Sequence, residues 1–185
     1  MQLEDFINEC RSRMDNSIEH LKEELAKIRA GKASPSLVSG LLVDYYGSPT
    51  PLSQVANIGT PDSRTIAIQP WEKSMLSNIE QAIFKANLGV TPMNDGETVR
   101  INIPPLTEDR RKDLVKQAKA TGEDCKVSIR SERTKIMNQI KSEVKEGYPE
   151  DAGKRKEEEV QKFVNGYGTE IDRLVDLKEK DIMTV

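Results

Sequence analysis

Lysine and arginine residues recur at helical spacing in the second half of the chain. Successive members are 4, 3, 7, 4 and 3 residues apart: Lys112, Lys116, Lys119, Lys126, Arg130 and Arg133. At about 100° per residue, these side chains share a sector roughly 100° wide, about a quarter turn from the apolar stripe of the same helix. A row of cations with this spacing can follow a phosphate backbone, because each contact releases condensed counterions.

Neighbouring residues leave two interpretations of this row. Arg110 and Arg111 add positive charge where the helix is predicted to begin, whereas Glu123 and Glu132 interrupt or border the row. Aromatic residues do not alternate with the cations, so binding of folded RNA by shape and phosphates fits better than stacking on single-stranded bases. A charge run on a bundle helix is, however, often only a solvated face. From these residues alone, both interpretations stay open.

Other residue types that could do chemistry do not form a recognisable site. His20 is the only histidine and lies in a polar part of a helix, which indicates a surface residue. Cys10 and Cys125 occupy apolar-stripe positions, where cysteine behaves as a small hydrophobe, and a zinc site would need more ligands. Glycine loops that cradle nucleotides are absent from the sequence. We therefore predict a protein that is not an enzyme, with no catalytic residue, metal or cofactor.

The composition limits the classes to which the protein can belong. Of its 185 residues, 32% are charged and 4% are aromatic, which favours long solvated helices over a β-sandwich. The 36% hydrophobic residues and a net charge of -3 are compatible with a folded core. The apolar runs are too short for a membrane span. Residues 1–5 include two acidic residues and are unlike the start of a signal peptide. With two cysteines, a cytoplasmic protein without disulfides is expected.

Three segments have the apolar periodicity of long helices. The first stripe is Leu3, Ile7, Cys10, Met14, Ile18, Leu21, Leu25 and Ile28. The second is Leu114, Ala118, Cys125, Ile129, Ile136, Ile140 and Val144. The third is Val160, Val164, Tyr167, Ile171, Leu174 and Ile182. One stripe per helix predicts an elongated three-helix bundle.

Capping and breaking residues indicate where these helices begin and end. Thr107 is a candidate N-cap for the second helix, and Gly147 is placed to stop it. Pro149 is expected to open the third helix. Within that helix, Gly166 and Gly168 are expected to weaken the structure, each by up to about 1 kcal/mol relative to alanine.

Residues 31–105 differ in composition from the rest of the chain. They hold 6 of the 11 glycines and 8 of the 9 prolines but few charges, a shift typical of domain boundaries. Strand-like runs occur at 41–46, 64–69 and 99–103. A helix is predicted over residues 75–88, with Gly89 as its stop. The chain is thus predicted to be an α+β protein, with this small domain inserted into a discontinuous bundle of residues 1–30 and 106–185.

Several motifs, in this order, resemble bacterial ribosome recycling factors. They are residues 27–35, 44–47, 50–51, 104–112 and 127–133, and the resemblance extends over essentially the whole chain. It implies an L-shaped molecule, with an elongated antiparallel three-helix bundle joined through a two-stranded hinge to a small β/α/β domain. It also implies binding to the large ribosomal subunit of the post-termination complex. Together with elongation factor G and GTP hydrolysis by that partner, such factors split the ribosome into subunits for reuse.

The resemblance further implies roles for individual residues. The residues that bind rRNA would be Arg110, Arg111, Arg130 and Arg133, with Lys116, Lys119 and Lys126 on the same face. The hinge would comprise Arg29, Ala30, Gly31, Pro104 and Pro105. Elongation factor G would act on the inner domain. Lys32 and Thr134 depart from the family, which usually or often has arginine there, and lysine loses the bidentate contact to phosphate.

A second class of function also fits the sequence, namely a helical-bundle adaptor that binds a protein partner without contacting RNA. Such an adaptor would bind with little salt dependence and would not need the row of cations. In either case, two self-contained cores without a conspicuous leftover apolar face favour a monomer.

Overall fold

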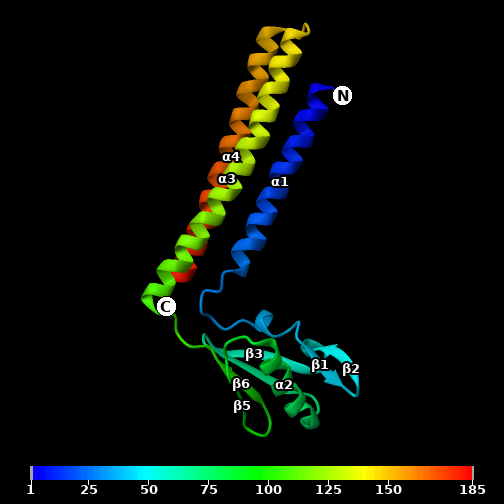
Figure 1. Ribbon diagram of the computed structural model, residues 1–185, viewed down its shortest axis with the longest axis vertical. Helices are drawn as coiled ribbons and strands as arrows, with labels where there is room; N and C mark the ends of the chain where they lie inside the picture. The colour runs from blue at the N-terminus through cyan, green and yellow to red at the C-terminus, as the bar shows by residue number, and fades with distance from the viewer. Residues whose placement is uncertain (1, 185) are drawn as a thin grey trace. The chain divides into compact units, whose positions relative to one another are not determined.

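The computed structural model describes residues 2–184 (Figure 1). Its helices are α1 (Leu3–Lys27), α2 (Leu76–Ala86), α3 (Glu108–Lys145) and α4 (Glu150–Met183). Its strands are β1 (Leu42–Tyr45), β2 (Ser48–Pro51), β3 (Ala56–Asp62), β4 (Thr65–Pro70), β5 (Pro92–Asn94) and β6 (Val99–Asn102). One compact unit combines the residues up to Ala30 with those from Glu108 onward, and the other is Gly31–Thr107. Within the described range, no helix is long and apolar enough to cross a membrane.

The first unit is a bundle of α1, α3 and α4, which lie side by side (Figure 1). Every residue of the predicted stripe from Leu3 to Ile28 is buried, which confirms that prediction. The thiol of Cys125 on α3 lies 3.5 Å from the carbonyl oxygen of Ser17 on α1. Seven residues further along α3, Glu132 contacts Arg13, which lies earlier in α1, so these two helices are antiparallel.

Helices α3 and α4 form an antiparallel pair joined by a tight turn. Gly147, with φ +112°, follows the end of α3, and Pro149 is the N-cap of α4, as the sequence predicts. Two glycines that the apolar pattern does not include allow the helices to approach closely. A β-carbon at Gly122 would lie 2.6 Å from Val175, and one at Gly153 would lie 2.7 Å from a methyl group of α3. Close helix packing therefore depends on these glycines.

Helix α4 is continuous from Glu150 to Met183, although Gly166 and Gly168 lie within it. Both glycines have open space where a side chain would project, so neither is required for packing. The helix is held by its neighbours instead, because Val160, Ile171 and Ile182 of the stripe are buried, while Val164, Tyr167 and Leu174 are half-buried. Tertiary packing of an amphipathic face commonly outweighs the low helix propensity of glycine.

The second unit contains a four-stranded antiparallel sheet in the order β3-β4-β6-β5, together with a separate β1-β2 hairpin. In the sheet, Ile66 pairs with Ile101 and Ile68 pairs with Val99, and all four side chains are buried. Helix α2 buries Ile79 and further apolar residues in the same hydrophobic core. This arrangement is the α+β unit that the sequence predicts.

Three strands of this unit were not predicted from the sequence. Strand β2 has the sequence Ser-Pro-Thr-Pro, β3 contains Gly59 and Pro61, and β5 is only three residues long. Proline and glycine are depleted in strands, and proline occurs mainly at edges, which is where β3 and β5 lie.

The predicted helix at residues 75–88 is α2, but its end differs from the expectation. Asn87, rather than Gly89, adopts the left-handed conformation that terminates the helix, with φ +49°. Asparagine tolerates this conformation better than most residues because its short polar side chain can bond locally. Gly89 has φ +73° in the connection that follows.

Candidate nucleic-acid interface on helix α3

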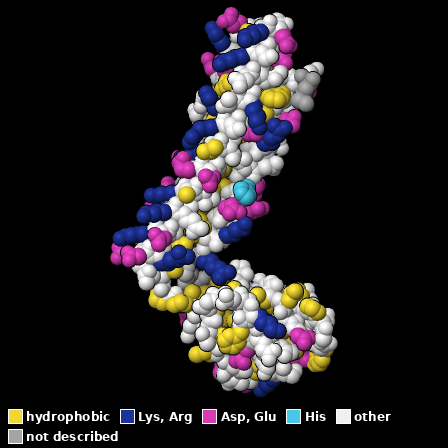
Figure 2. Space-filling view, in the orientation of Figure 1, with side chains coloured by type: hydrophobic (Ala, Val, Ile, Leu, Met, Phe, Trp, Pro, Cys, Tyr) yellow, Lys and Arg dark blue, Asp and Glu magenta, His cyan; other side chains and the backbone are white. Residues whose placement is uncertain are grey.

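The predicted cations lie on α3 and differ in how far they are accessible to solvent. Five are exposed: Arg110, Lys112, Lys116, Lys119 and Arg130. Three are half-buried: Arg111, Lys126 and Arg133. Figure 2 shows Lys and Arg side chains along the edge of the bundle formed by α3 and α4, with Asp and Glu side chains among them. What this face offers to an anion therefore depends on which cations are already paired.

Lys126 is the most closely paired cation of the row. Its Nζ lies 2.8 Å from Oδ1 of Asp172 on α4 and 3.6 Å from Oε1 of Glu123 on α3. The hydrogen bond with Asp172 is the main cause of the raised pKa of Lys126, and Glu123 adds to the effect. Because its side chain is only 29% exposed, Lys126 links α3 to α4 in addition to contributing positive charge.

Two further cations are paired more loosely. Lys119 Nζ lies 3.8 Å from Oε1 of Glu179 on α4, and Arg130 Nη2 lies 3.7 Å from Oε2 of Glu123. The two cationic side chains are 60% and 65% exposed. Exposed pairs of this kind contribute at most about 1 kcal/mol. A phosphate oxygen can therefore replace the carboxylate at little cost.

The exposed Lys116 has no ion pair among the described residues, which makes it the most available of these lysines. Lys112 is also exposed, but its Nζ lies 3.4 Å from Oε1 of Glu108 one turn earlier. Lysine acts on phosphate as a compact point charge, so an unpaired ammonium group can bind it without fixed geometry. Lys116 is therefore the simplest probe of anion binding on this face.

The two half-buried arginines are held differently. Arg133 Nε donates a hydrogen bond to Oε1 of Gln161 on α4, with a nitrogen–oxygen distance of 2.8 Å. This bond uses one of the five guanidinium donors and leaves the others able to contact a phosphate. Arg111 Nε is buried and has no hydrogen-bond partner among the described residues. Arg133 is therefore pre-positioned by α4, whereas Arg111 is not.

The partners on α4 are the part of this site that reasoning from the sequence missed. Lys119 and Lys126 are seven residues apart, and so are Asp172 and Glu179. Because α3 and α4 run in opposite directions, the first lysine meets the second carboxylate and the second lysine meets the first: Lys119 pairs with Glu179 and Lys126 with Asp172. This matched spacing is the one signal that could have predicted the ion pairs, and it requires knowing the register of α3 against α4.

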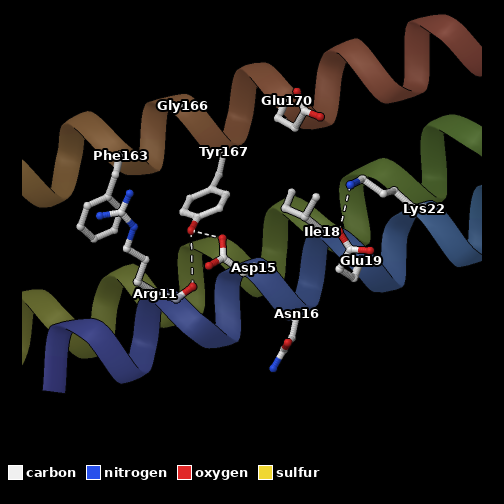
Figure 3. A pocket seen from close by; sticks show the side chains of 10 residues that line it. All are labelled: Arg11, Asp15, Asn16, Ile18, Glu19, Lys22, Phe163, Gly166, Tyr167 and Glu170. Carbon is white, nitrogen blue, oxygen red and sulfur yellow. Dashed lines mark hydrogen bonds and ion pairs between the residues drawn. The ribbon is translucent and has the colours of Figure 1, made fainter. Parts of the chain in front are cut away.

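A groove between α1 and α4 is a second place where polar groups gather (Figure 3). The Arg11 guanidinium lies 5.0 Å from the centre of the Phe163 ring, and the Tyr167 hydroxyl donates a hydrogen bond to Asp15. Burial, together with this hydrogen bond, raises the pKa of Tyr167 to about 12. These polar groups pair with one another across the groove, so they hold two helices together and do not converge on a ligand.

The predicted hinge residues lie outside the regular elements: Arg29, Ala30, Gly31, Pro104 and Pro105. Gly31 has φ +74°, and a β-carbon there would lie 2.7 Å from Cγ of Leu106. Both the conformation and the close approach therefore require glycine. Pro104 and Pro105 are exposed, and the ring of each restricts φ. The second connecting segment is thus conformationally restricted, whereas the first turns at a position that glycine adopts readily and other residues do not.

A family model described as "Ribosome recycling factor" matches residues 21–183. The chain belongs to the ribosome recycling factor family. The ribosome-recycling factor of Christiangramia forsetii is 52% identical, with 100% of this chain and 99% of that protein covered. That of Flavobacterium johnsoniae is 53% identical, with 98% and 97% covered. That of Staphylococcus haemolyticus is 50% identical, with 99% and 100% covered.

Solved structures of ribosome recycling factors are similar to this chain over its whole length. One is the solution structure of a ribosome recycling factor, with a TM-score of 0.77, 37% identity, and 100% of this chain and 99% of that chain covered. Another is a T. thermophilus ribosome recycling factor described with E. coli elongation factor G, bound to the E. coli post-termination complex. It has a TM-score of 0.63 and 41% identity, with both chains fully covered. These similarities confirm the predicted α+β fold of this recycling-factor chain.

Proposed function

We propose that this recycling-factor chain binds the large ribosomal subunit of the post-termination complex and, with elongation factor G and GTP, splits the ribosome into subunits for reuse. The observation that carries the proposal is the full-length similarity to ribosome-recycling factors. A relative described on a post-termination complex together with elongation factor G supports the choice of partners. GTP hydrolysis would occur on that partner, so the chain itself would act by binding, without a catalytic residue or cofactor of its own.

In this proposal, rRNA lies against α3 and its phosphates contact the accessible cations. The proposed rRNA-binding residues are Arg110, Arg111, Lys116, Lys119, Lys126, Arg130 and Arg133. Lys116 and Arg130 are exposed and would supply direct charge contacts. Arg133 is pre-positioned by Gln161, so less side-chain entropy would be lost when it binds.

We further propose that the two compact units act as separate domains. The factor would be a monomer and would act in the cytoplasm. The inner domain, residues 31–105, would be the part on which elongation factor G acts. The five hinge residues would then transmit that action to the bundle. The two connecting segments favour this role because a double connection would permit hinge motion and resist free tumbling of the domains.

The RNA-binding part of the proposal predicts a charge-specific loss on replacing Lys116. Lys116→Ala should weaken binding to purified large subunits by up to about tenfold and reduce the salt slope by about 1, because one phosphate contact is lost. Lys22→Ala is the charge control, since it removes the same charge from an exposed position on α1, although Lys22, unlike Lys116, is paired with Glu19. Sedimentation at several salt concentrations measures both. If Lys116→Ala and Lys22→Ala both bind as tightly as the wild type, the proposal that the α3 cations bind rRNA is contradicted and a protein adaptor is favoured.

The function itself is tested by light scattering of post-termination ribosomes. The chain should accelerate the fall in scattering only when elongation factor G and GTP are both present. Omitting GTP, or replacing it with GDP, is the control for the nucleotide requirement. A rate of splitting that is the same with and without the chain would contradict the proposed function.

A further inference from the structure

Glu123 occupies the central position of the cation row on α3. The separation of seven residues between Lys119 and Lys126 is the one irregular step in an otherwise alternating spacing of three and four. Glu123 follows Lys119 by four residues and precedes Lys126 by three, so it stands where the pattern lacks a cation. On a helix, residues three and four apart are surface neighbours. The acidic residue is thus inserted within the row and does not lie beside it.

Both oxygens of Glu123 are engaged by cations of the row. Oε1 lies 3.6 Å from Lys126 Nζ, and Oε2 lies 3.7 Å from Arg130 Nη2. The Glu123 side chain is 63% exposed, and all three residues lie on the same helix. These contacts therefore do not connect one helix to another. Their separations also exceed those of a charge-assisted hydrogen bond, so they can be exchanged readily.

An anion that approaches this face must compete with the Glu123 carboxylate. A phosphate that binds Lys126 or Arg130 separates one of the existing pairs and then lies close to a negative charge. Both the separation of the pair and the repulsion between the two anions oppose binding. In the free protein neither effect operates, so the carboxylate has little effect on its stability. Asp172 opposes binding at Lys126 in the same way, but it also links α3 to α4, so its replacement would confound binding with stability.

We propose that Glu123 is an intramolecular competitor of RNA phosphate, which holds Lys126 and Arg130 in the free protein and limits how tightly and how long the row binds. This inference rests on the proposed function, because it assumes that the row contacts rRNA. The advantage of such a competitor is rapid dissociation, since a factor that is used repeatedly must leave the subunit after each round.

Glu123→Gln tests the competition, because it keeps the size of the side chain and removes its charge. Asp124→Asn is the matched control, since it makes the same change in charge at the next residue. The Asp124 side chain is exposed and forms no ion pair among the described residues. Binding of fluorescently labelled protein to purified large ribosomal subunits is measured at several KCl concentrations, and dissociation is followed after adding unlabelled protein. Thermal unfolding by circular dichroism verifies that both variants fold.

Glu123→Gln is expected to bind about 3- to 10-fold more tightly than the wild type, because the ion pairs of Glu123 with Lys126 and Arg130 no longer oppose binding. Its dissociation should be slower by a similar factor, and its affinity should fall more steeply with salt, because Arg130 then loses its acidic partner and Lys126 keeps only Asp172. Asp124→Asn should stay within about twofold of the wild type, since it is outside the row. A change in helix stability alone would not alter the salt slope.

Arg130→Ala separates this inference from the proposed function. If Arg130→Ala weakens binding but Glu123→Gln binds no more tightly than Asp124→Asn, the competitor role is wrong and the RNA-binding face stands. If Arg130→Ala and Lys116→Ala both bind as the wild type does, the face itself is wrong and the inference fails with it.

Discussion

Replacing Gly122 with alanine should destabilise the bundle, although alanine is the better helix former. A β-carbon at Gly122 would lie 2.6 Å from Cγ2 of Val175 on α4. Carbon atoms in optimal contact are about 3.5–4.0 Å apart, so this contact would be roughly 1 Å too short. Valine has one strongly preferred rotamer in a helix, so Val175 cannot turn aside without strain. Helices α3 and α4 would have to separate locally.

The size of the effect follows from two opposing contributions. Overpacking of this kind costs about 1–3 kcal/mol, and the better helix propensity of alanine returns up to about 1 kcal/mol. With that gain subtracted, the expected net loss at Gly122 is up to about 2 kcal/mol in the free energy of unfolding. At Gly166, a β-carbon would meet no atom within 4 Å. Gly166→Ala should therefore stabilise the protein by about 0.5–1 kcal/mol.

Urea unfolding followed by far-UV circular dichroism measures both variants against the wild type. If the slope of the unfolding free energy against urea concentration is the same in all three proteins, the same unfolding transition is being compared. The same chemical change should thus have opposite effects on stability at two positions of the bundle. A stabilising effect of Gly122→Ala, or effects of the same sign at both positions, would refute this expectation.

Two further predictions concern groups with shifted pKa values. Tyr167→Phe should lower the free energy of unfolding by about 1 kcal/mol, because the hydrogen bond to Asp15 is lost. The folded-state pKa of Tyr167 is about 12, above its ordinary value, so its contribution to stability should be complete below about pH 10 and lost as the pH rises towards 12. The difference in phenolate absorbance between the wild type and Tyr167→Phe measures the titration of this one tyrosine among four, and a difference that titrates near pH 10 would contradict the assignment. In the second unit, hydrogen bonds from the backbone N–H groups of Thr98 and Glu97 lower the pKa of Asp95 to about 2. Its contribution should therefore be complete above about pH 4 and lost as the pH falls towards 2, and Asp95→Asn should abolish this part of the pH dependence. The fluorescence of Trp71, the only tryptophan, reports unfolding of that unit, and an unchanged profile in Asp95→Asn would count against this role.

The long helices of the bundle could be predicted because their signals are local. The stripe from Leu3 to Ile28 repeats every three or four residues, and each of its members is buried. Gly147 and Pro149 mark the turn between α3 and α4 through their own backbone preferences. Neither signal depends on which segment of the chain lies opposite.

The short strands could not be predicted in this way. Strand β2 is stabilised by pairing with β1, where Val43 is opposite Thr50, and not by the preferences of its own Ser-Pro-Thr-Pro sequence. Strand β3 likewise pairs with β4 although it contains Gly59 and Pro61. Pairing with a neighbouring strand is a long-range interaction, so residue preferences within four to seven positions do not reveal it.

The cation row shows the same division between local pattern and long-range contact. Helical periodicity places the lysines and arginines on one face of α3 whatever surrounds them, so the sequence alone determines that the face exists, despite the overall charge of -3. Which cations are available to an anion depends on the register of α3 against α4. That register brings Asp172 to Lys126, Glu179 to Lys119 and Gln161 to Arg133. Residues that are far apart in the chain meet only when the helices pack, so the fold, and not the spacing, decides which charges remain free.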